Sequence, residues 1–241
     1  MPEIVIKVEQ VSKFFGEDQV LKEVSVQLEK GKAYGIIGNN GSGKTVLFKC
    51  ICGFMKPDKG IIEVEQKRIG VDIDFPENIG IIIETPGFLP YNTGFRNLQI
   101  LASLRGIIQK ADIIKTLEKV GLDPRMKKPV GKYSLGMRQR LGIAQAIMED
   151  PQILILDEPF NGLDKHGVED IREIIIELKK QGKTIVLASH NSEDIRILCD
   201  TVFEMDAGVI KEVTANEKTA NEKTGCFEAI QNDNDSISCC I

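Results

Sequence analysis

Hydrophobic and polar residues alternate along two segments near the start of the chain. The segments are EIVIKVEQV (residues 3–11) and QVLKEVSVQL (19–28), and the turn-like residues GED (16–18) separate them. A period of two places the apolar side chains on one face of a strand. The pattern therefore predicts two antiparallel strands with one face exposed to solvent.

From residue 32 onward, short apolar runs are separated by helical patterns. The runs are KAYGIIG (32–38), IGIIIE (79–84), QILILD (152–157) and KTIVLAS (183–189), and GIIEVEQKRI (60–69) is also typical of a strand. Helical spacing follows Lys44, recurs between 90 and 150, and recurs again over 167–183. Strands that alternate with helices predict a parallel sheet with crossover helices, which is an α/β fold.

Three polar residues stand where the apolar runs end. Glu84 closes IGIIIE, which we expect to be a central strand buried on both faces. Asp157 closes QILILD, and His190 follows KTIVLAS. Because ligands of open parallel sheets collect beyond the carboxyl ends of the strands, these three residues are candidates for one site.

Composition limits the classes of partner. The chain has 241 residues, a formal net charge of −5 and a pI near 5.3, so it offers no basic field for nucleic acid. The first residues do not resemble a signal peptide and no run of about 18 apolar residues occurs, so the chain is expected in the cytoplasm. The six cysteines form no Cys-x-x-Cys pair, which favours reduced thiols.

The segment GNNGSGKT (38–45) matches the phosphate-loop pattern G-x-x-x-x-G-K-[ST], and it lies between a predicted strand and a predicted helix. Its glycines allow backbone N–H groups to converge on phosphate oxygens at a helix N-terminus. Lys44 would reach the β- and γ-phosphates, and the Thr45 hydroxyl would bind Mg²⁺. The motif predicts a site for a nucleoside triphosphate formed by Gly38, Asn39, Asn40, Gly41, Ser42, Gly43, Lys44 and Thr45.

The second acidic motif, ILILDEP, ends an apolar strand with two carboxylates. Asp157 suits the acid that holds the Mg²⁺ of the nucleotide, since this ion favours one or two carboxylates plus phosphates and water. Glu158 is placed to polarise the water that attacks the γ-phosphate. An acidic turn exposed to solvent would not explain why an apolar strand stops at this pair.

The block YSLGMRQRLGIAQAIMEDPQILILDEPFNGLD (133–164) resembles the signature and acidic motifs of ATP-binding cassette (ABC) ATPases. In Tyr133–Met137 the serine and second glycine of the family signature Leu-Ser-Gly-Gly-Gln are present, whereas the first glycine and the glutamine are replaced. The resemblance implies that Ser134 and Gly136 cap the γ-phosphate of ATP bound to a second subunit. It covers nearly the whole chain from Ile4 to about Val213.

Other positions match the family one at a time. Phe15 resembles the aromatic residue that stacks on adenine, although Phe14 is an adjacent candidate and a core role is the alternative. Asp164 resembles an acid of the dimer-contact loop, and His190 resembles the histidine that contacts the γ-phosphate. His166, in a charged turn, is interpreted as a surface residue.

The resemblance also implies an organisation into parts. Residues 1–84 and 151–213 would form a P-loop NTPase core, with a RecA-like parallel sheet and an N-terminal antiparallel β subdomain. Residues 85–150 would form an inserted helical subdomain, and 214–241, which contain the repeat TANEKTANEKT, a disordered tail. ATP would close a head-to-tail dimer, and a separate membrane permease would bring the chain to the inner face of the membrane.

Most family members carry glutamine where this chain has Glu84, and the acid would contact Mg²⁺ or the attacking water. Together with YSLGMRQRLGIA, this acid resembles exporters of bacitracin and lantibiotics. Three alternatives stay open: a soluble iron–sulfur assembly scaffold, a DNA-repair cassette and a regulatory nucleotide binder. The DNA-repair class requires a long coiled coil between the two nucleotide motifs, where no sustained heptads occur.

Overall fold

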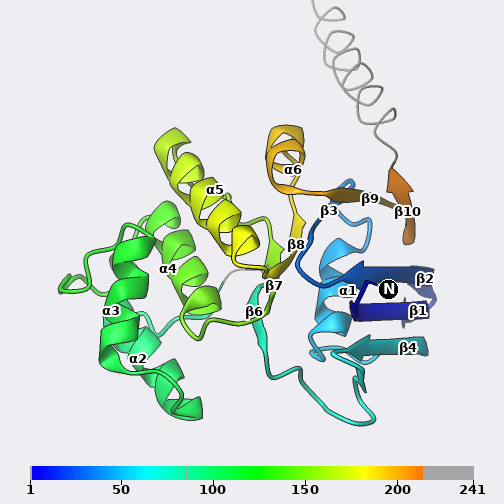
Figure 1. Ribbon diagram of the computed structural model, residues 1–241, viewed down its shortest axis with the longest axis horizontal. Coiled ribbons are helices and arrows are strands. Elements are labelled where there is room, and N and C mark those ends of the chain that lie inside the picture. Colours follow the sequence, from blue (N-terminus) through cyan, green and yellow to red (C-terminus); the bar gives the residue numbers. More distant parts are fainter. Residues whose placement is uncertain (1, 85, 214–241) are drawn as a thin grey trace, which may run out of the picture.

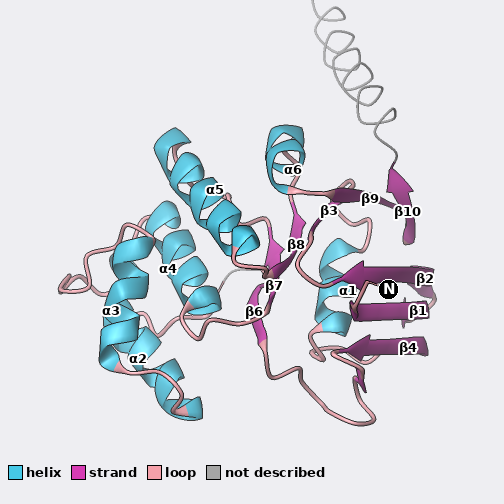
Figure 2. Cartoon of the chain, in the orientation of Figure 1, coloured by secondary structure: helices cyan, strands magenta, loops and turns pink. Residues whose placement is uncertain are grey.

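The computed structural model describes residues 2–84 and 86–213, which form two sheets and the helices around them (Figures 1 and 2). The first sheet is antiparallel, with strand order β2-β1-β4-β5. Its strands are β1 (Ile4–Phe15), β2 (Asp18–Glu29), β4 (Lys59–Val64) and β5 (Lys67–Arg68). The expected antiparallel pair near the start of the chain is confirmed, with Val8 opposite Val26.

The second sheet has the order β10-β9-β3-β8-β7-β6. Strands β9, β3, β8, β7 and β6 run parallel, and β10 pairs antiparallel with β9. Their bounds are β3 (Ala33–Ile37), β6 (Ile79–Ile82), β7 (Ile153–Asp157), β8 (Thr184–Ala188), β9 (Thr201–Asp206) and β10 (Val209–Val213). The expected parallel sheet is therefore present, and its strands are linked by crossover helices.

The middle strands of the parallel sheet are buried on both faces. In β7, Leu154 and Leu156 belong to one apolar cluster while Ile153 and Ile155 belong to another. Helix α1 (Lys44–Ile51) packs in the second cluster together with residues of the antiparallel sheet, so it lies between the two sheets (Figure 1). Burial on both faces explains why β7 and β8 read as unbroken apolar runs.

The helices between 90 and 150 gather on the side of the parallel sheet away from the antiparallel one (Figure 1). They are α2 (Gly94–Arg105), α3 (Lys110–Lys119), the short 3₁₀ helix Val130–Lys132 and α4 (Leu135–Ile147). Their buried residues share one cluster with β7 and with α5 (Lys165–Lys180). Helix α6 (Ser192–Leu198) lies beside α5 and completes this layer.

Two sequence expectations about strands are wrong. The segment 60–69 is divided into β4 and β5 by a turn at Glu65 and Gln66, whose φ angles of 48° and 64° suit a two-residue hairpin. Strand β6 lies at the edge of the described sheet and not at its centre, and Ile79 and Ile81 are only partly buried. The TANEK repeat and the last three cysteines lie outside the described residues.

Candidate functional site

The predicted phosphate loop connects β3 to α1 and contains a buried lysine and a buried serine. The Lys44 ammonium donates to the carbonyl oxygens of Gly38 and Asn39 at 2.7 and 3.0 Å. The hydroxyl of Ser42 is buried and has no hydrogen-bond partner among the described residues. Gly38 has a φ of 146°, and a methyl group there would lie 2.1 Å from the Met205 carbonyl oxygen. A loop with a buried cation and an unused hydroxyl fits the phosphates of a nucleotide.

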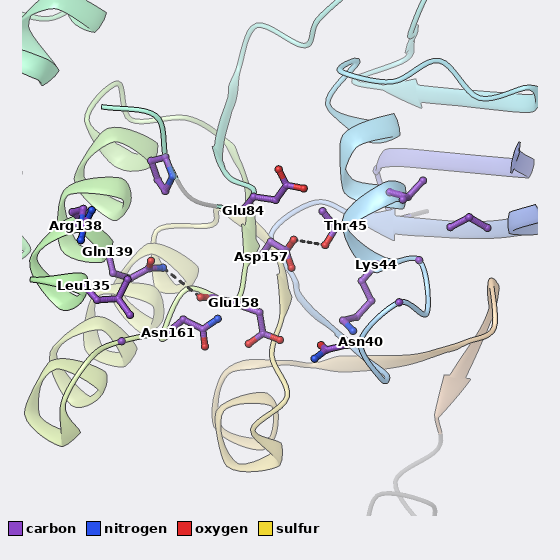
Figure 3. Close-up of a pocket in the computed structure, with 16 residues that line it drawn as sticks. Asn40, Lys44, Thr45, Glu84, Leu135, Arg138, Gln139, Asp157, Glu158 and Asn161 are labelled. Carbon is purple, nitrogen blue, oxygen red and sulfur yellow. Dashed lines mark hydrogen bonds between the residues drawn. The ribbon is translucent and has the colours of Figure 1, made fainter. Parts of the chain in front are cut away.

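Asp157 lies at the carboxyl end of β7, opposite the start of α1. Its Oδ2 accepts a 2.6 Å hydrogen bond from Thr45 Oγ1 (Figure 3). Burial raises the pKa of Asp157, while the Thr45 hydroxyl and the Lys44 charge act against that rise. A buried carboxylate beside a hydroxyl is a suitable pair of oxygen ligands for Mg²⁺. The described residues contain no group of three or more His, Cys, Asp or Glu side chains that could hold a metal ion. The nucleotide and water would therefore have to supply the other ligands of a Mg²⁺ ion bound by Thr45 and Asp157.

Glu158 is held in an unusual backbone conformation directly beyond β7. Its φ is 50°, and its N–H donates to the Ala188 carbonyl oxygen at 3.0 Å. Its Oε2 lies 2.8 Å from Nδ1 of His190, so the acid and the histidine meet although 32 residues separate them. Left-handed backbone is costly for a residue with a Cβ, and such outliers cluster at functional sites.

Glu84 follows the end of β6 and has a similar conformation, with a φ of 58°. Its side chain is 62% exposed, and Oε1 accepts a 2.6 Å hydrogen bond from Nζ of Lys49 on α1. The negative charge of Glu84 adds to the rise in the pKa of Asp157. Glu84 therefore lies beside the acidic end of β7, but its carboxylate is paired with a lysine.

Part of the set described above lines a cleft with a volume of about 810 Å³. Figure 3 shows Lys44, Thr45 and Asn40 on one side of the cleft and Gln139 and Leu135 on the other, with Asp157 and Glu158 between them. The predicted residues in its lining are Asn40, Gly41, Gly43, Lys44, Thr45, Glu84, Asp157 and Glu158. Residues predicted for the site but absent from this lining are Phe15, Gly38, Asn39, Ser42, Ser134, Gly136, Asp164 and His190.

The signature segment begins helix α4 at the rim of the cleft. Ser134 is the N-cap of α4, and its hydroxyl accepts a 3.2 Å hydrogen bond from the backbone N–H of Met137. A Cβ on Gly136 would lie 2.8 Å from the carbonyl oxygen of Gly162, so the helix start packs closely on that loop. Asp164 caps α5 in the same way, accepting from the Gly167 N–H at 3.0 Å.

Phe15 lies at the end of β1 and is 47% exposed, with the Lys13 ammonium 5.8 Å from its ring centre. An aromatic face that is half open to solvent is available for stacking, whereas a core residue would be covered. His166 is 91% exposed and lies 3.7 Å from Glu169, as a surface residue would.

Gln139, which is buried on α4, was not among the site residues predicted from the sequence. Its side-chain amide donates to the carbonyl oxygens of Pro159 and Glu158 at 2.9 and 3.3 Å, which joins α4 to the loop of the catalytic candidates. The signal was present, because Gln139 falls on the same helical stripe as Gly142 and Ile143, which are buried. A polar residue on an apolar stripe must find a buried partner. Arg138 and Asn161, which also line the cleft, carried no such signal.

The chain is similar to known proteins over most of its length. Residues 21–161 match the family model described as ABC transporter. The uncharacterized ABC transporter ATP-binding protein YybJ of Bacillus subtilis (strain 168) is 43% identical over 204 residues, which are 85% of this chain and 94% of that protein. The bacitracin transport ATP-binding protein BcrA of Enterococcus faecalis is 42% identical over 218 residues, covering 89% and 71%. The lantibiotic transport ATP-binding protein SrtF of Streptococcus pyogenes is 36% identical over 199 residues, covering 82% and 85%.

Solved structures of cassettes have the same fold. A nucleotide-free ATP-binding cassette from an ABC transporter superposes with a TM-score of 0.77 at 28% identity, covering 92% of this chain and 95% of that one. The cbiO1 protein of Clostridium perfringens, part of the ABC transporter complex cbiONQ, gives 0.74 at 25% identity and covers 96% of both chains. No helix within the described residues has the length and apolar character needed to cross a membrane. By its motifs, its fold and these relatives, the chain belongs to the ABC transporter family as an ATP-binding, ATP-hydrolysing subunit.

Proposed function

We propose that the cleft binds ATP together with Mg²⁺ and that two copies of the chain close head to tail around two nucleotides. Hydrolysis then opens the pair. The cleft supports this proposal because Lys44 and Thr45 at the start of α1 face Asp157 and Glu158 at the carboxyl end of β7. These groups act by positioning and by stabilising charge, without a covalent intermediate.

Binding is assigned to the phosphate loop and to Asp157. The Lys44 ammonium exchanges its two backbone carbonyl partners for the β- and γ-phosphates, and the Ser42 hydroxyl gains a phosphate oxygen as a partner. Thr45 and Asp157 would hold Mg²⁺, which would neutralise charge on the phosphates. Phe15 provides the stacking surface for the adenine.

Hydrolysis is assigned to Glu158 and His190. The Glu158 carboxylate orients the attacking water and accepts its proton, because it stands one residue beyond the acid that holds the metal. His190 keeps the carboxylate in place through the 2.8 Å contact and reaches toward the γ-phosphate. This contact between two residues from different strand ends is the single observation that carries the proposal.

The second subunit supplies the groups that one cleft lacks. Ser134 and Gly136, at the positive N-terminal end of α4, approach the γ-phosphate bound by the opposite copy. Asp164 lies in the loop before α5 and contributes to the contact between the copies.

The test of hydrolysis is the Glu158→Gln variant. We expect ATP turnover to fall by about 100-fold or more, while the dissociation constant for ATP changes little, because only the general base is removed. Glu169→Gln, which changes an exposed carboxylate near His166, is the matched control and should keep full turnover. Unchanged turnover in Glu158→Gln would refute the assignment.

We further propose that the chain powers a separate permease that exports a peptide antibiotic of the bacitracin or lantibiotic type. Two observations support this: the bacitracin and lantibiotic transport functions for which the relatives BcrA and SrtF are named, and the acid at position 84 in the loop after β6. Relatives named as transport proteins do not favour the iron–sulfur scaffold alternative. With its permease, the chain would lie on the cytoplasmic face of the membrane.

Two experiments test the transport proposal. The tagged chain should co-purify from detergent-solubilised membranes with a multi-span protein, and recovery from membranes without any hydrophobic partner would contradict it. Cells that express the chain and that permease should tolerate a higher concentration of bacitracin or of a lantibiotic. The Glu158→Gln variant should abolish the tolerance without reducing the amount of the complex.

A further inference from the structure

We propose that Arg172 and Asp194 are positioning residues that hold the His190 loop against Glu158. This inference rests on the role given to His190 above and adds the groups that keep that histidine in place. His190 itself is not packed into the protein, since 72% of its side chain is exposed. Its position must therefore be determined by the backbone on either side of it.

The neighbours of His190 are linked to a buried carboxylate through the Ser189 hydroxyl. The Ser189 hydroxyl donates to Oδ2 of Asp194 at 3.2 Å, and it accepts a 3.1 Å hydrogen bond from the backbone N–H of Asn191. Asp194 is 1% exposed. The chain segment that carries His190 is thus closed into a small loop around Asp194.

The buried carboxylate is in turn held by a cation from another helix. Arg172, on α5, donates from Nε to Oδ1 of Asp194 at 2.7 Å and from Nη2 to Oε2 of Glu193 at 3.0 Å. Helices α5 and α6 lie side by side, so the pair crosses between them (Figure 1). The Arg172 side chain is itself only 15% exposed, which leaves little water to replace it.

The cost of burying the Asp194 carboxylate requires Arg172 to stay in one position. A carboxylate taken out of water is stable only if its partners are in place, and loss of one partner leaves a charge that the interior does not tolerate. The planar guanidinium also fixes the direction of its hydrogen bonds, which a lysine ammonium does not do as strictly. Arg172 therefore determines where Asp194 lies, and Asp194 determines where Ser189 and His190 lie.

A double-mutant cycle distinguishes positioning of His190 from general support of the fold. Arg172→Met is measured alone and in the His190→Ala background, with kcat and KM for ATP and the thermal unfolding midpoint as readouts. We expect Arg172→Met to lower kcat by about tenfold with KM within about twofold, and to lower it no further once His190 is absent. Arg172→Lys should restore part of kcat, because one ionic hydrogen bond can re-form.

The control is another ion pair on the same helix. Glu177→Gln removes the 2.8 Å contact between Glu177 and Lys119, and it should leave kcat unchanged. If Arg172→Met does not fold, Arg172→Lys takes its place in the cycle. Amide hydrogen exchange over residues 189–194, measured without nucleotide, provides a readout independent of turnover and should be faster in the Arg172 variant.

Each outcome decides between the claims. Unchanged kcat in a folded Arg172 variant, or an equal loss with and without His190, overturns the positioning role. If His190→Ala keeps full turnover, the role proposed for His190 fails instead. In that case the exchange measurement still decides whether Arg172 holds the loop, because unchanged exchange at 189–194 would overturn it.

Discussion

Gln139 offers a quantitative test of how helix α4 holds the loop that contains Glu158. The perturbation is Gln139→Met, which keeps the length of the side chain and its helix propensity but removes the amide donor. Two carbonyl oxygens are affected, those of Glu158 and Pro159. The loss should appear both in the stability of the protein and in its turnover.

The magnitude follows from the partners that each carbonyl keeps. The Glu158 oxygen also accepts from the N–H of Asn161 at 3.2 Å, so it stays satisfied. The Pro159 oxygen is buried and has no other partner among the described residues. Leaving one such acceptor unpaired costs about 1–3 kcal/mol. At about 2 kcal/mol, the unfolding midpoint of a chain of this size should fall by about 4–8 °C.

The assay is thermal or urea unfolding of the variant, combined with ATP turnover at saturating ATP. Turnover should fall by about tenfold, because Glu158 loses part of the support for its left-handed backbone. Gln181→Met is the control, since it removes only a 3.0 Å hydrogen bond between exposed side chains at the end of α5. Stability within about 0.5 kcal/mol of the wild type would refute the reasoning.

Three other predictions concern packing, pH and the acid after β6. Gly80→Ala should destabilise the protein by about 1–3 kcal/mol in urea unfolding, because the methyl group would lie 1.9 Å from the Ala146 carbonyl oxygen. Burial would raise the pKa of Asp200, but a backbone N–H and Lys179 hold it below its usual range, so its stabilising effect is present at neutral pH and lost in acid. The destabilisation by Asp200→Asn, measured by urea unfolding across pH, should therefore shrink as the pH falls below about 4. Glu84→Gln should leave ATP binding intact, by calorimetry, while changing hydrolysis or its coupling to transport.

The predictions for Gly80 and Glu84 have matched controls, and each of the three has a result that would contradict it. Gly87→Ala adds a methyl group where no atom lies within 4 Å, and equal effects at positions 80 and 87 would contradict the packing explanation. If the destabilisation by Asp200→Asn does not change with pH, the charge of the Asp200 carboxylate is not the source of its stabilising effect. For Glu84, the control is Lys49→Met, which removes the partner and keeps the acid, and a Glu84→Gln variant identical to the wild type in both assays would make the acid incidental.

Local patterns predicted those parts of the fold that local physics determines. The alternation in β1 and β2 and the apolar runs of β7 and β8 reflect the number of faces that each strand buries. The phosphate-loop motif could also be recognised from the sequence, because its glycines and Lys44 are close neighbours along the chain. The predicted strand ends at Asp157 and Glu158 were accurate for the same reason.

Strand order and contacts between residues far apart in the chain could not be predicted from the sequence. The position of β6 at the sheet edge depends on strand order, which periodicity within the strand does not encode. The pairing of Glu84 with Lys49 joins residues 35 positions apart, and the contact of Glu158 with His190 joins residues 32 apart. Such contacts require the sheet to be assembled, so the sequence indicated Glu84, Glu158 and His190 but neither Lys49 nor the direct contact of Glu158 with His190.

The left-handed backbone at Glu84 and Glu158 has a consequence for the chain under selection. Glycine adopts this conformation freely, whereas a residue with a Cβ loses on the order of 1 kcal/mol. A laboratory screen that rewards only heat resistance should therefore enrich glycine at both positions and discard both carboxylates. A screen that rewards antibiotic tolerance should retain both carboxylates. The two screens would therefore select different residues, glycine or glutamate, after the neighbouring strands β6 and β7.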